Sequence, residues 1–303
     1  MSGTWFHRRG ELARDGWESV VDESVPGWQH TGLHVAELAA GDELTLADTG
    51  SERIVVPLRG SFEVERTEDG RTHTTELAGR RSVFAGPTDV LYVSTGASLR
   101  IRGAGRVAIA SSPTDRRHPS RRIAASEVAV ELRGAGASSR QVHNFGTPGS
   151  LDAARLIVCE VLTPAGNWSS YPAHKHDEHV PGHESRLEEI YYFESEPVAG
   201  AGATASEAAF GLFSTTSSPA GEIAIDAQVR SGDIALVPYG YHGPAVAAPG
   251  YDLYYLNVMA GPDAERAWLI SDDPDHAWVR ETWRTQQIDP RLPYRGATDE
   301  EER

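Results

Sequence analysis

Two histidines separated by a single residue, His174 and His176, form the strongest chemical signal in this chain. In an extended strand, residues i and i+2 point to the same face, so the two imidazoles would lie side by side. Paired imidazoles are natural ligands for a divalent metal ion. The pair alone is also compatible with a histidine-rich surface loop, because His179 and His183 follow closely.

Three further features favour a metal site. Glu189 begins a strongly apolar aromatic run, where a carboxylate is costly to bury unless a cation compensates its charge. His242 follows a strand pattern and a Pro/Gly turn, and these elements occur in order within one half of the chain. We therefore predict that His174, His176, Glu189 and His242 bind a divalent ion. Glu188 is the alternative carboxylate if the register slips by one residue. Zn, Mn, Fe and Ni all suit this ligand set.

The elements that must position these ligands are strands. Helical patterns are sparse, and short runs of Val, Ile, Leu, Tyr and Phe alternate with turn residues, which is typical of a sandwich or barrel. We expect an all-β fold. Strands are predicted over residues 32–38, 53–58, 60–66, 81–84, 89–93, 98–103, 106–111, 155–163, 189–194, 209–214, 223–229, 233–237 and 253–260, with one further candidate strand at 125–132 and a short helix or turn within 263–280.

The two halves of the chain have a similar layout. Residues 232–240 and 86–96 each run from a turn through an apolar strand into a second turn, which indicates a weak internal duplication of one barrel. The first half has no H-x-H pair. We predict a metal-free N-terminal domain at 1–112, a connector at 113–150, and a metal-binding C-terminal domain with a tail at 151–303.

Composition narrows the class of protein. Of the 303 residues 39% are hydrophobic and 24% charged, as in globular chains, and no apolar run is long enough to span a membrane. A formal net charge of −16 disfavours partners such as nucleic acid or anionic membranes. The N-terminus has no secretory apolar core and Cys159 is the only cysteine, so we expect a cytoplasmic protein.

The metal-site elements resemble the two motifs of the cupin superfamily, an H-x-H pair with a following Glu and a glycine-led strand that ends in a His. Longer stretches are similar to the 5-deoxy-glucuronate isomerases of myo-inositol catabolism. These stretches are residues 83–93, 167–177, 184–193, 238–244, 257–261 and 272–278.

The resemblance implies two tandem cupin barrels, each a double-stranded β-helix or jelly roll. It also implies an aldose–ketose isomerase that converts 5-deoxy-D-glucuronate to 5-dehydro-2-deoxy-D-gluconate. Where the family often carries a Gln-Arg pair this chain has Phe213 and Ser214, which leaves the exact uronate open. The alternatives are a related isomerase of pectin-derived deoxy-hexosulose-uronates, a cupin dioxygenase, and a sugar-binding module without turnover.

An isomerase needs a proton shuttle, and its sugar-acid substrate needs a cation. Shuttle candidates near the expected barrel mouth are Glu188, Tyr191, Tyr192, His179 and His183. Arg186 or Lys175 could bind the substrate carboxylate, although strand parity turns Lys175 away from the metal ligands. Our catalytic candidates are Glu188, Tyr192, Lys175 and Arg186. We also expect a homo-oligomer, because open sheet edges need cover.

Overall fold

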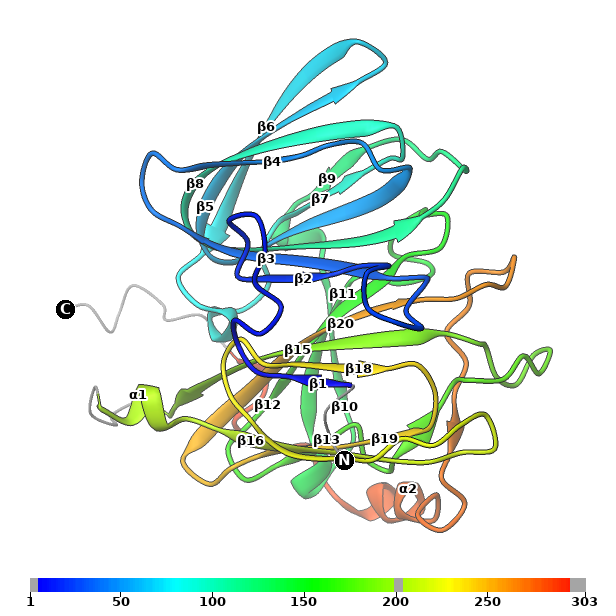
Figure 1. Cartoon of the computed structure of the whole chain (residues 1–303). Helices are drawn as coiled ribbons and strands as arrows, with labels where there is room; N and C mark the ends of the chain where they lie inside the picture. The colour runs from blue at the N-terminus through cyan, green and yellow to red at the C-terminus, as the bar shows by residue number, and fades with distance from the viewer. Residues whose placement is uncertain (1–4, 199–203, 295–303) are drawn as a thin grey trace.

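The protein is built almost entirely of β-strands, as expected. The computed structural model describes residues 5–198 and 204–294. Two β-domains lie one above the other in Figure 1, the first half of the chain (blue to cyan) above and the second half (green to orange) below. No helix in these described ranges is long and apolar enough to cross a membrane.

The upper domain is one strongly bent antiparallel sheet of eight strands, with the order β2-β3-β8-β5-β7-β9; β4 pairs with β8 and β6 with β5. Their bounds are β2 Ser19–Val21, β3 Gly32–Leu38, β4 Glu43–Leu46, β5 Ser51–Glu68, β6 Arg71–Arg80, β7 Val90–Val93, β8 Ala97–Pro113 and β9 Arg121–Ile123. The long strands β5 and β8 pair along their whole length and carry apolar residues on the buried face.

The lower domain consists of two sheets. The larger sheet has the order β1-β18-β15-β20-β12-β11-β10 and the smaller β17-β16-β19-β14-β21, with β13 paired to β19. The larger sheet comprises β1 Phe6–His7, β10 Ala129–Arg133, β11 Arg140–Gly146, β12 Ile157–Thr163, β15 Glu188–Pro197, β18 Ile234–Val237 and β20 Tyr251–Ala260. The smaller comprises β13 Trp168–Ser169, β14 His174–Lys175, β16 Gly211–Thr216, β17 Ile225–Val229, β19 Tyr241–Ala247 and β21 Ser271–Asp272.

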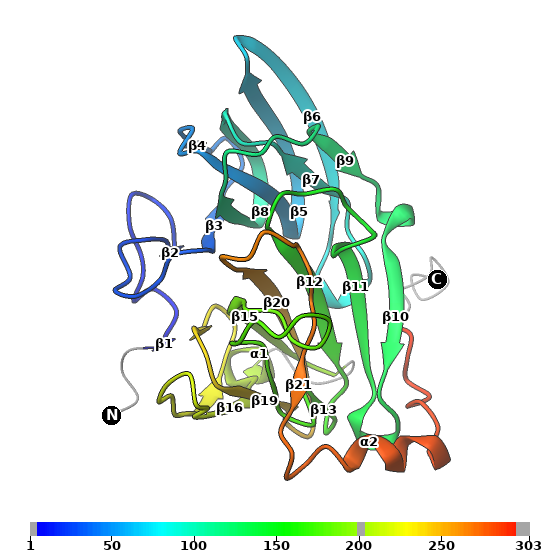
Figure 2. The same ribbon diagram turned by 90° about the vertical axis from the view of Figure 1, so that its right-hand side faces the viewer.

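Helical segments are short and lie outside the sheets. They are the α-helices α1 Thr204–Ala208 and α2 Val279–Thr282 and the 3-10 turns η1 Val83–Ala85, η2 Ala125–Glu127, η3 Gly136–Ser138 and η4 Trp283–Thr285. Figure 2 shows the β10–β11 hairpin running down one side of the molecule to α2. Within residues 263–280, where a short helix or turn was predicted, the chain forms turns at 274–278, and α2 begins only at Val279.

The predicted connector, residues 113–150, is distributed between the domains. Strand β9 belongs to the upper sheet, whereas β10 and β11 form an edge of the larger lower sheet. Strand β1 also crosses over, because Phe6 and His7 pair with Ala235 and Ile234 of β18. The division of the strands between the sheets therefore does not coincide with the predicted domain boundaries. Whether residues 1–112 and 151–303 fold as separate units stays a prediction.

Most predicted strands are present, with three informative differences. Residues 53–58 and 60–66 form one strand, β5, and residues 98–103 and 106–111 form one strand, β8. Residues 81–84 do not form a strand, because Ser82 caps the 3-10 turn η1 by accepting a hydrogen bond from the Phe84 N–H. Two strands that were not predicted are β6, which is largely polar, and β19, which follows the glycine turn.

The core continues from one domain to the other. One cluster of buried side chains contains upper-domain residues such as Ile54 and Tyr92 together with lower-domain residues such as Ile190 and Tyr254. A second cluster fills the interior of the lower barrel and includes Tyr191, Phe193 and Phe213. The outward face of β15 thus packs against the upper domain, and its inward face lines the lower barrel.

Candidate metal centre

Strand β15 decides which of two neighbouring glutamates enters the barrel. It pairs with β18 and β20 over its buried length, so its side chains alternate between the two faces of the sheet. Glu189 shares the inward face with Tyr191 and Phe193, which belong to the barrel core. Glu189 is 2% exposed.

The histidine pair reaches Glu189 because a loop closes between them. The His176 carbonyl accepts a hydrogen bond of 2.8 Å from the Leu187 N–H, which brings the two ends of residues 177–186 together. Strand β14 then pairs with β19 so that His174 lies directly opposite His242. The glycine after His242 permits a close approach of β19 to Ser170: Gly243 has φ +101°, and a Cβ there would lie 1.8 Å from the Ser170 carbonyl oxygen.

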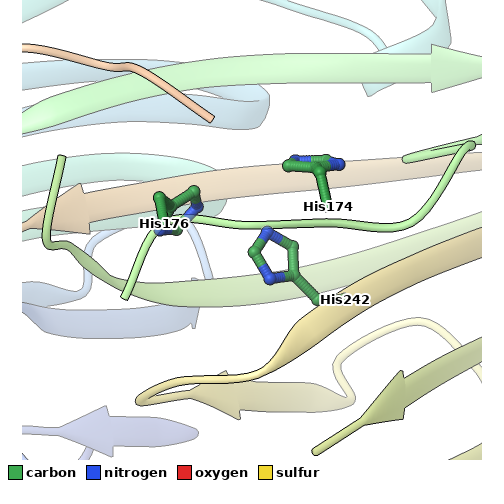
Figure 3. A group of neighbouring side chains, drawn as sticks. All are labelled: His174, His176 and His242. Carbon is green, nitrogen blue, oxygen red and sulfur yellow. The ribbon is translucent and has the colours of Figure 1, made fainter. Parts of the chain in front are cut away.

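The four predicted ligands converge. One nitrogen from each of His174, His176 and His242 lies within 4.8 Å of the others, and Figure 3 shows the three imidazoles grouped around one point. Glu189 Oε2 is 3.0 Å from His176 Nε2 and 3.1 Å from His242 Nε2. The structure therefore brings together all four side chains that the sequence singled out.

The donor set fits a metal ion. The Nδ1 atoms of His176 and His242 lie 3.1 Å from the carbonyl oxygens of Leu187 and Gly240, an arrangement that leaves each Nε2 lone pair directed into the cluster. Nδ1 of His174 is buried without a hydrogen-bond partner among the described residues. An unpartnered buried nitrogen of this kind is expected where a cation belongs.

Electrostatics favours the metal-binding protonation states of His174 and Glu189. Burial, reinforced by the neighbouring His242 and His176, holds the pKa of His174 well below its usual value, so its imidazole is neutral at pH 7. Burial by itself would raise the pKa of Glu189, but hydrogen bonds to His176 and His242 outweigh it and lower that pKa to about 2. The carboxylate is therefore ionised, as a ligand must be.

A cavity of about 250 Å³ opens beside this cluster. His174 and Glu189 form part of its wall together with Ser170, Tyr191 and Asn257. The remaining lining residues are Arg133, Arg140, Val142, Val161, Tyr255, Trp268, Ile270 and Arg280. A ligand in this cavity would meet two of the four candidate metal ligands, the hydroxyl groups of a serine and two tyrosines, an amide and three guanidinium groups.

Two of the four predicted catalytic side chains lie on the wrong face of β15, which corrects the expectation that they reach the barrel mouth. Glu188 accepts hydrogen bonds from the backbone N–H groups of residues 29–31 in the upper domain, at 2.6 to 3.2 Å. Tyr192 bonds Arg106, at 2.6 Å, and Glu194, and belongs to the interdomain core. Neither residue lines the cavity.

The two predicted cations are also outside the cavity. Lys175 Nζ donates to Asp177, Glu178 and Glu184 at 2.7 to 3.1 Å, so its ammonium fills the second group of potential metal-binding side chains found among the described residues. The parity argument against Lys175 agrees with this orientation. Arg186 is exposed and pairs with Asp263 at 3.3 Å, on a different surface.

Of the other residues considered in the sequence analysis, only Tyr191 lines the cavity. His179 pairs with Asp263 at 3.0 Å, His183 lies on the exposed loop, and neither lines the cavity. Phe213 is buried in the barrel core, and the Ser214 hydroxyl donates to Asp226 on the outside. Tyr191 is the one shuttle candidate in the cavity, where its hydroxyl lies 3.0 Å from Ser170 Oγ.

The sequence analysis missed Asn257 and the three cavity arginines, Arg133, Arg140 and Arg280. Two of these arginines flank the turn of the β10–β11 hairpin, in a segment whose composition is typical of a connector. No alternation marks β11, because it is buried along almost all of its length, and its mixed sequence Arg-Gln-Val-His-Asn-Phe-Gly conceals that burial.

Comparison with known proteins places the chain in a family. The model of the KduI/IolB family matches residues 5–279. Two proteins named 5-deoxy-glucuronate isomerase, from Geobacillus thermodenitrificans and Geobacillus kaustophilus, are 40% and 41% identical to the chain over 271 residues, which is 87% of this chain and 90% of each relative.

Solved structures support the same assignment. An IolB-like protein from Salmonella typhimurium LT2 superposes with a TM-score of 0.78 at 31% identity, covering 91% of this chain and 98% of that one. The oxalate decarboxylase of Lactobacillus farciminis superposes at 0.61 with 10% identity over 90% and 89% of the two chains, a likeness of fold alone. The predicted fold, two tandem cupin barrels, is confirmed, and the chain belongs to the KduI/IolB family.

Proposed function

We propose that this protein is a metal-dependent aldose–ketose isomerase that converts 5-deoxy-D-glucuronate to 5-dehydro-2-deoxy-D-gluconate in myo-inositol catabolism. The observation that carries the proposal is the convergence of His174, His176, His242 and Glu189 beside a polar cavity. The relatives that are about 40% identical over most of the chain are named for this reaction.

The reaction moves hydrogen without any net oxidation. The C1 aldehyde becomes a primary alcohol and the C2 alcohol becomes a ketone: hydrogen moves from C2 to C1, and a proton moves from the C2 oxygen to the C1 oxygen. Negative charge develops on these two neighbouring oxygens. A divalent ion held by the four side chains would supply Lewis-acid stabilisation to both.

The chain's own groups would handle the protons and orient the sugar. Burial raises the pKa of Tyr191 well above its usual value, so its hydroxyl stays protonated and can donate, with Ser170 Oγ 3.0 Å away as a relay. The buried Nδ2 of Asn257 has no hydrogen-bond partner among the described residues and can donate to a sugar hydroxyl. Val142, Val161 and Ile270 provide apolar walls that limit access of water.

The test is a metal analysis combined with NMR. Purified protein is analysed for bound metals by mass spectrometry, and 5-deoxy-D-glucuronate is followed by proton NMR under nitrogen. We expect ketose signals to replace the anomeric signals, EDTA to stop the change, and His174→Ala to lose both metal and activity. In D2O, deuterium at C1 would indicate an enediol route, and its absence a direct hydride transfer.

Other results would redirect the proposal. If metal is bound but only a pectin-derived deoxy-hexosulose-uronate reacts, the substrate assignment is wrong and the ketol-isomerase chemistry stands. Consumption of oxygen instead of isomerisation would support a dioxygenase. Absence of any bound or loadable metal would overturn the metal site itself.

Three finer points belong to the proposal. We expect Zn, Mn, Fe or Ni as the native ion, and the metal analysis decides among them. We expect a homo-oligomer, which light scattering after gel filtration measures. The cytoplasmic location stays a prediction from the sequence, testable by cell fractionation.

A further inference from the structure

One end of the cavity contains more positive charge than its neighbours neutralise. Arg133 and Arg140 are directly opposite each other in the β10–β11 hairpin, and Arg280 joins them from α2. Arg133 pairs with Glu131 at 2.8 Å, and Arg280 pairs with Asp272. Three guanidinium groups against two carboxylates leave one positive charge without a partner.

The unpaired charge is Arg140. Its side chain is buried, and no carboxylate of the described residues forms an ion pair with it; the hydrogen bond that its guanidinium donates runs from Nη1 to the Ser138 carbonyl, at 3.0 Å. Burial and then the neighbouring Arg133 and Arg280 lower the pKa of Arg140 to about 10, despite the opposing effect of Tyr255. The guanidinium nevertheless remains charged at pH 7. A buried charge without a counter-ion is costly, so it needs an explanation.

Two tryptophan rings contact the three arginines without neutralising their charge. The guanidinium groups of Arg140 and Arg280 both lie against the ring of Trp283, at 5.5 and 5.1 Å from its centroid. Arg133 lies 5.2 Å from the ring of Trp268. These aromatic rings orient the guanidinium planes but supply no negative charge.

The same cavity offers other unused donors. Among its lining residues, Asn257 Nδ2 and Trp268 Nε1 are buried and have no hydrogen-bond partner in the described part of the chain. Buried polar atoms are satisfied in the great majority of cases, so their concentration around one cavity indicates a polar ligand rather than a packing defect.

Arg133 and Arg140 share one face of the larger lower sheet with Glu189, one of the four proposed metal ligands. Val142 of β11 pairs with Val161 of β12, Val161 with Tyr255 of β20, and Tyr255 with Phe193 of β15, the strand whose inward face also carries Glu189. Arg140 is on the same face as Val142, two residues away. Strands β15 and β11 are three positions apart, about 14 Å between backbones. Their side chains therefore enclose space for a short carbon chain.

We propose that Arg140, flanked by Arg133 and Arg280, binds the carboxylate of the sugar-acid substrate while the histidine end of the cavity receives its C1 and C2 oxygens. This inference rests on the proposed function and specifies how that site selects uronates over neutral sugars. The carboxylate supplies the missing negative charge, and a bidentate guanidinium pair fixes the sugar's direction in the cavity. Arg140 is thus a specificity-determining residue.

The experiment compares two substrates that differ only at C6: 5-deoxy-D-glucuronate and 5-deoxy-D-glucose, in which CH2OH replaces the carboxylate. The metal-loaded enzyme is assayed as wild type, Arg140→Gln and Arg140→Lys. We expect Arg140→Gln to lower kcat/KM for the acid about 100-fold, mainly through KM, and to change the neutral sugar less than about 3-fold. Arg140→Lys should recover part of the loss because it restores the charge but not the planar fork.

A charge-matched control and a binding measurement complete the design. Arg121→Gln removes an exposed upper-domain arginine paired with Glu127, and it should leave both substrates unaffected. Calorimetry with the substrate reduced at C1 to an alcohol measures binding without turnover, and the affinity should depend on Arg140. Thermal melting of Arg140→Gln should be unchanged or raised, because an unpaired buried charge is removed; an arginine with a purely structural role would give a lower Tm.

The outcomes separate the two proposals. If wild type isomerises the acid but Arg140→Gln discriminates between the two sugars as well as wild type does, the carboxylate site is overturned and the function stands. If wild type isomerises neither sugar, the proposed function fails, and binding of the reduced acid then decides: dependence on Arg140 supports the site, and independence overturns it. If Arg140→Gln does not fold, Arg280→Gln tests the same cluster, with a smaller expected loss because Arg280 already has Asp272.

Discussion

Glu188 and Glu189 are neighbours in the chain, yet β15 directs them to different domains. Glu189 faces the three histidines, whereas Glu188 accepts hydrogen bonds from three consecutive backbone N–H groups at residues 29–31. Glu189 is therefore suited to bind a metal ion, whereas Glu188 stabilises the contact between the two domains. The same substitution at the two positions should therefore have different consequences.

We predict that Glu189→Gln lowers the metal content and activity more than 10-fold, because it removes a charged ligand. Glu188→Gln should retain the metal but lower the free energy of unfolding by about 2 kcal/mol, since an amide satisfies the three N–H donors less well than a carboxylate. Metal analysis and urea unfolding of both variants check this. Loss of metal from Glu188→Gln alone would show that the register argument is wrong.

A second prediction concerns the tyrosines on the two faces of β15. Tyr191→Phe removes the hydroxyl beside Ser170 in the cavity and should lower kcat about 100-fold or more, with metal content unchanged. Tyr192→Phe removes a hydroxyl that bonds Arg106 and Glu194, outside the cavity, and should act on stability. Steady-state kinetics would contradict this assignment if Tyr192→Phe lost the greater share of kcat.

At this scale the convergence of the four proposed metal ligands could be predicted from the sequence, because H-x-H spacing and strand parity are local properties. The choice of Glu189 over Glu188 followed from the apolar run after it, and the geometry agrees. Arg140 could not be found in this way. Its importance depends on the absence of a nearby carboxylate, and that is a property of the folded environment alone.

Among the elements, the bent strands β5 and β8 shape the upper domain. The pairing of β5 with β8 shifts register between Pro57 and Arg59, and Gly60 follows with φ +86°. A Cβ on Gly60 would lie 1.9 Å from the Ala104 carbonyl oxygen. Because glycine is also a turn signal, the sequence analysis predicted two strands where one strand bends through a bulge. The distinction requires knowing that β8 accompanies β5 around the bend.

We predict that Gly60→Ala lowers the free energy of unfolding by about 3 kcal/mol, near the upper end for single substitutions. Gly50→Ala is the matched control, since Gly50 has φ +69° but a Cβ added there would meet no atom within 4 Å. It should cost only the backbone strain, about 1 kcal/mol. Equal losses for the two variants in chemical denaturation would mean that the contact with Ala104 is easily relieved.

At the scale of the whole molecule, a buried ionic network joins the two domains. Glu160 of β12 binds Arg80 of β6 and lies 2.9 Å from both the His143 Nδ1 atom and the Tyr254 hydroxyl. The side chains of Arg80 and Glu160 are 3% and 0% exposed. Burial would raise the pKa of Glu160, but Arg80 and His143 outweigh it and lower the pKa to about 2.

This network predicts a pH dependence of stability. The folded pKa of Glu160 is below its ordinary value of 4.5, so its contribution is fully present above about pH 4.5 and is lost as the pH falls toward 2. The difference in unfolding free energy between wild type and Glu160→Gln should be about 3 kcal/mol at pH 7 and should shrink between pH 4.5 and 3. Urea titrations across this range measure it; a constant difference would contradict the assigned pKa.

Pairing between strands that are distant in the sequence also limited how much of the whole fold could be predicted. The repeated turn–strand pattern indicated two similar halves, and two β-domains are present. Nothing in residues 129–146 reveals that β10 and β11 complete the sheet of the second domain, because their partner β12 comes later in the chain and β-pairing is non-local.

Strand β1 pairs with a strand that is synthesised much later, which affects the order in which the chain can fold. Phe6 pairs with Ala235, a separation of 229 residues, so β1 has no partner until most of the chain has left the ribosome. The upper sheet can form first, since its strands are complete by Ile123, while the leading segment remains unpaired. Pairing of β1 with β18 can therefore occur only late in folding, after β18 has been synthesised.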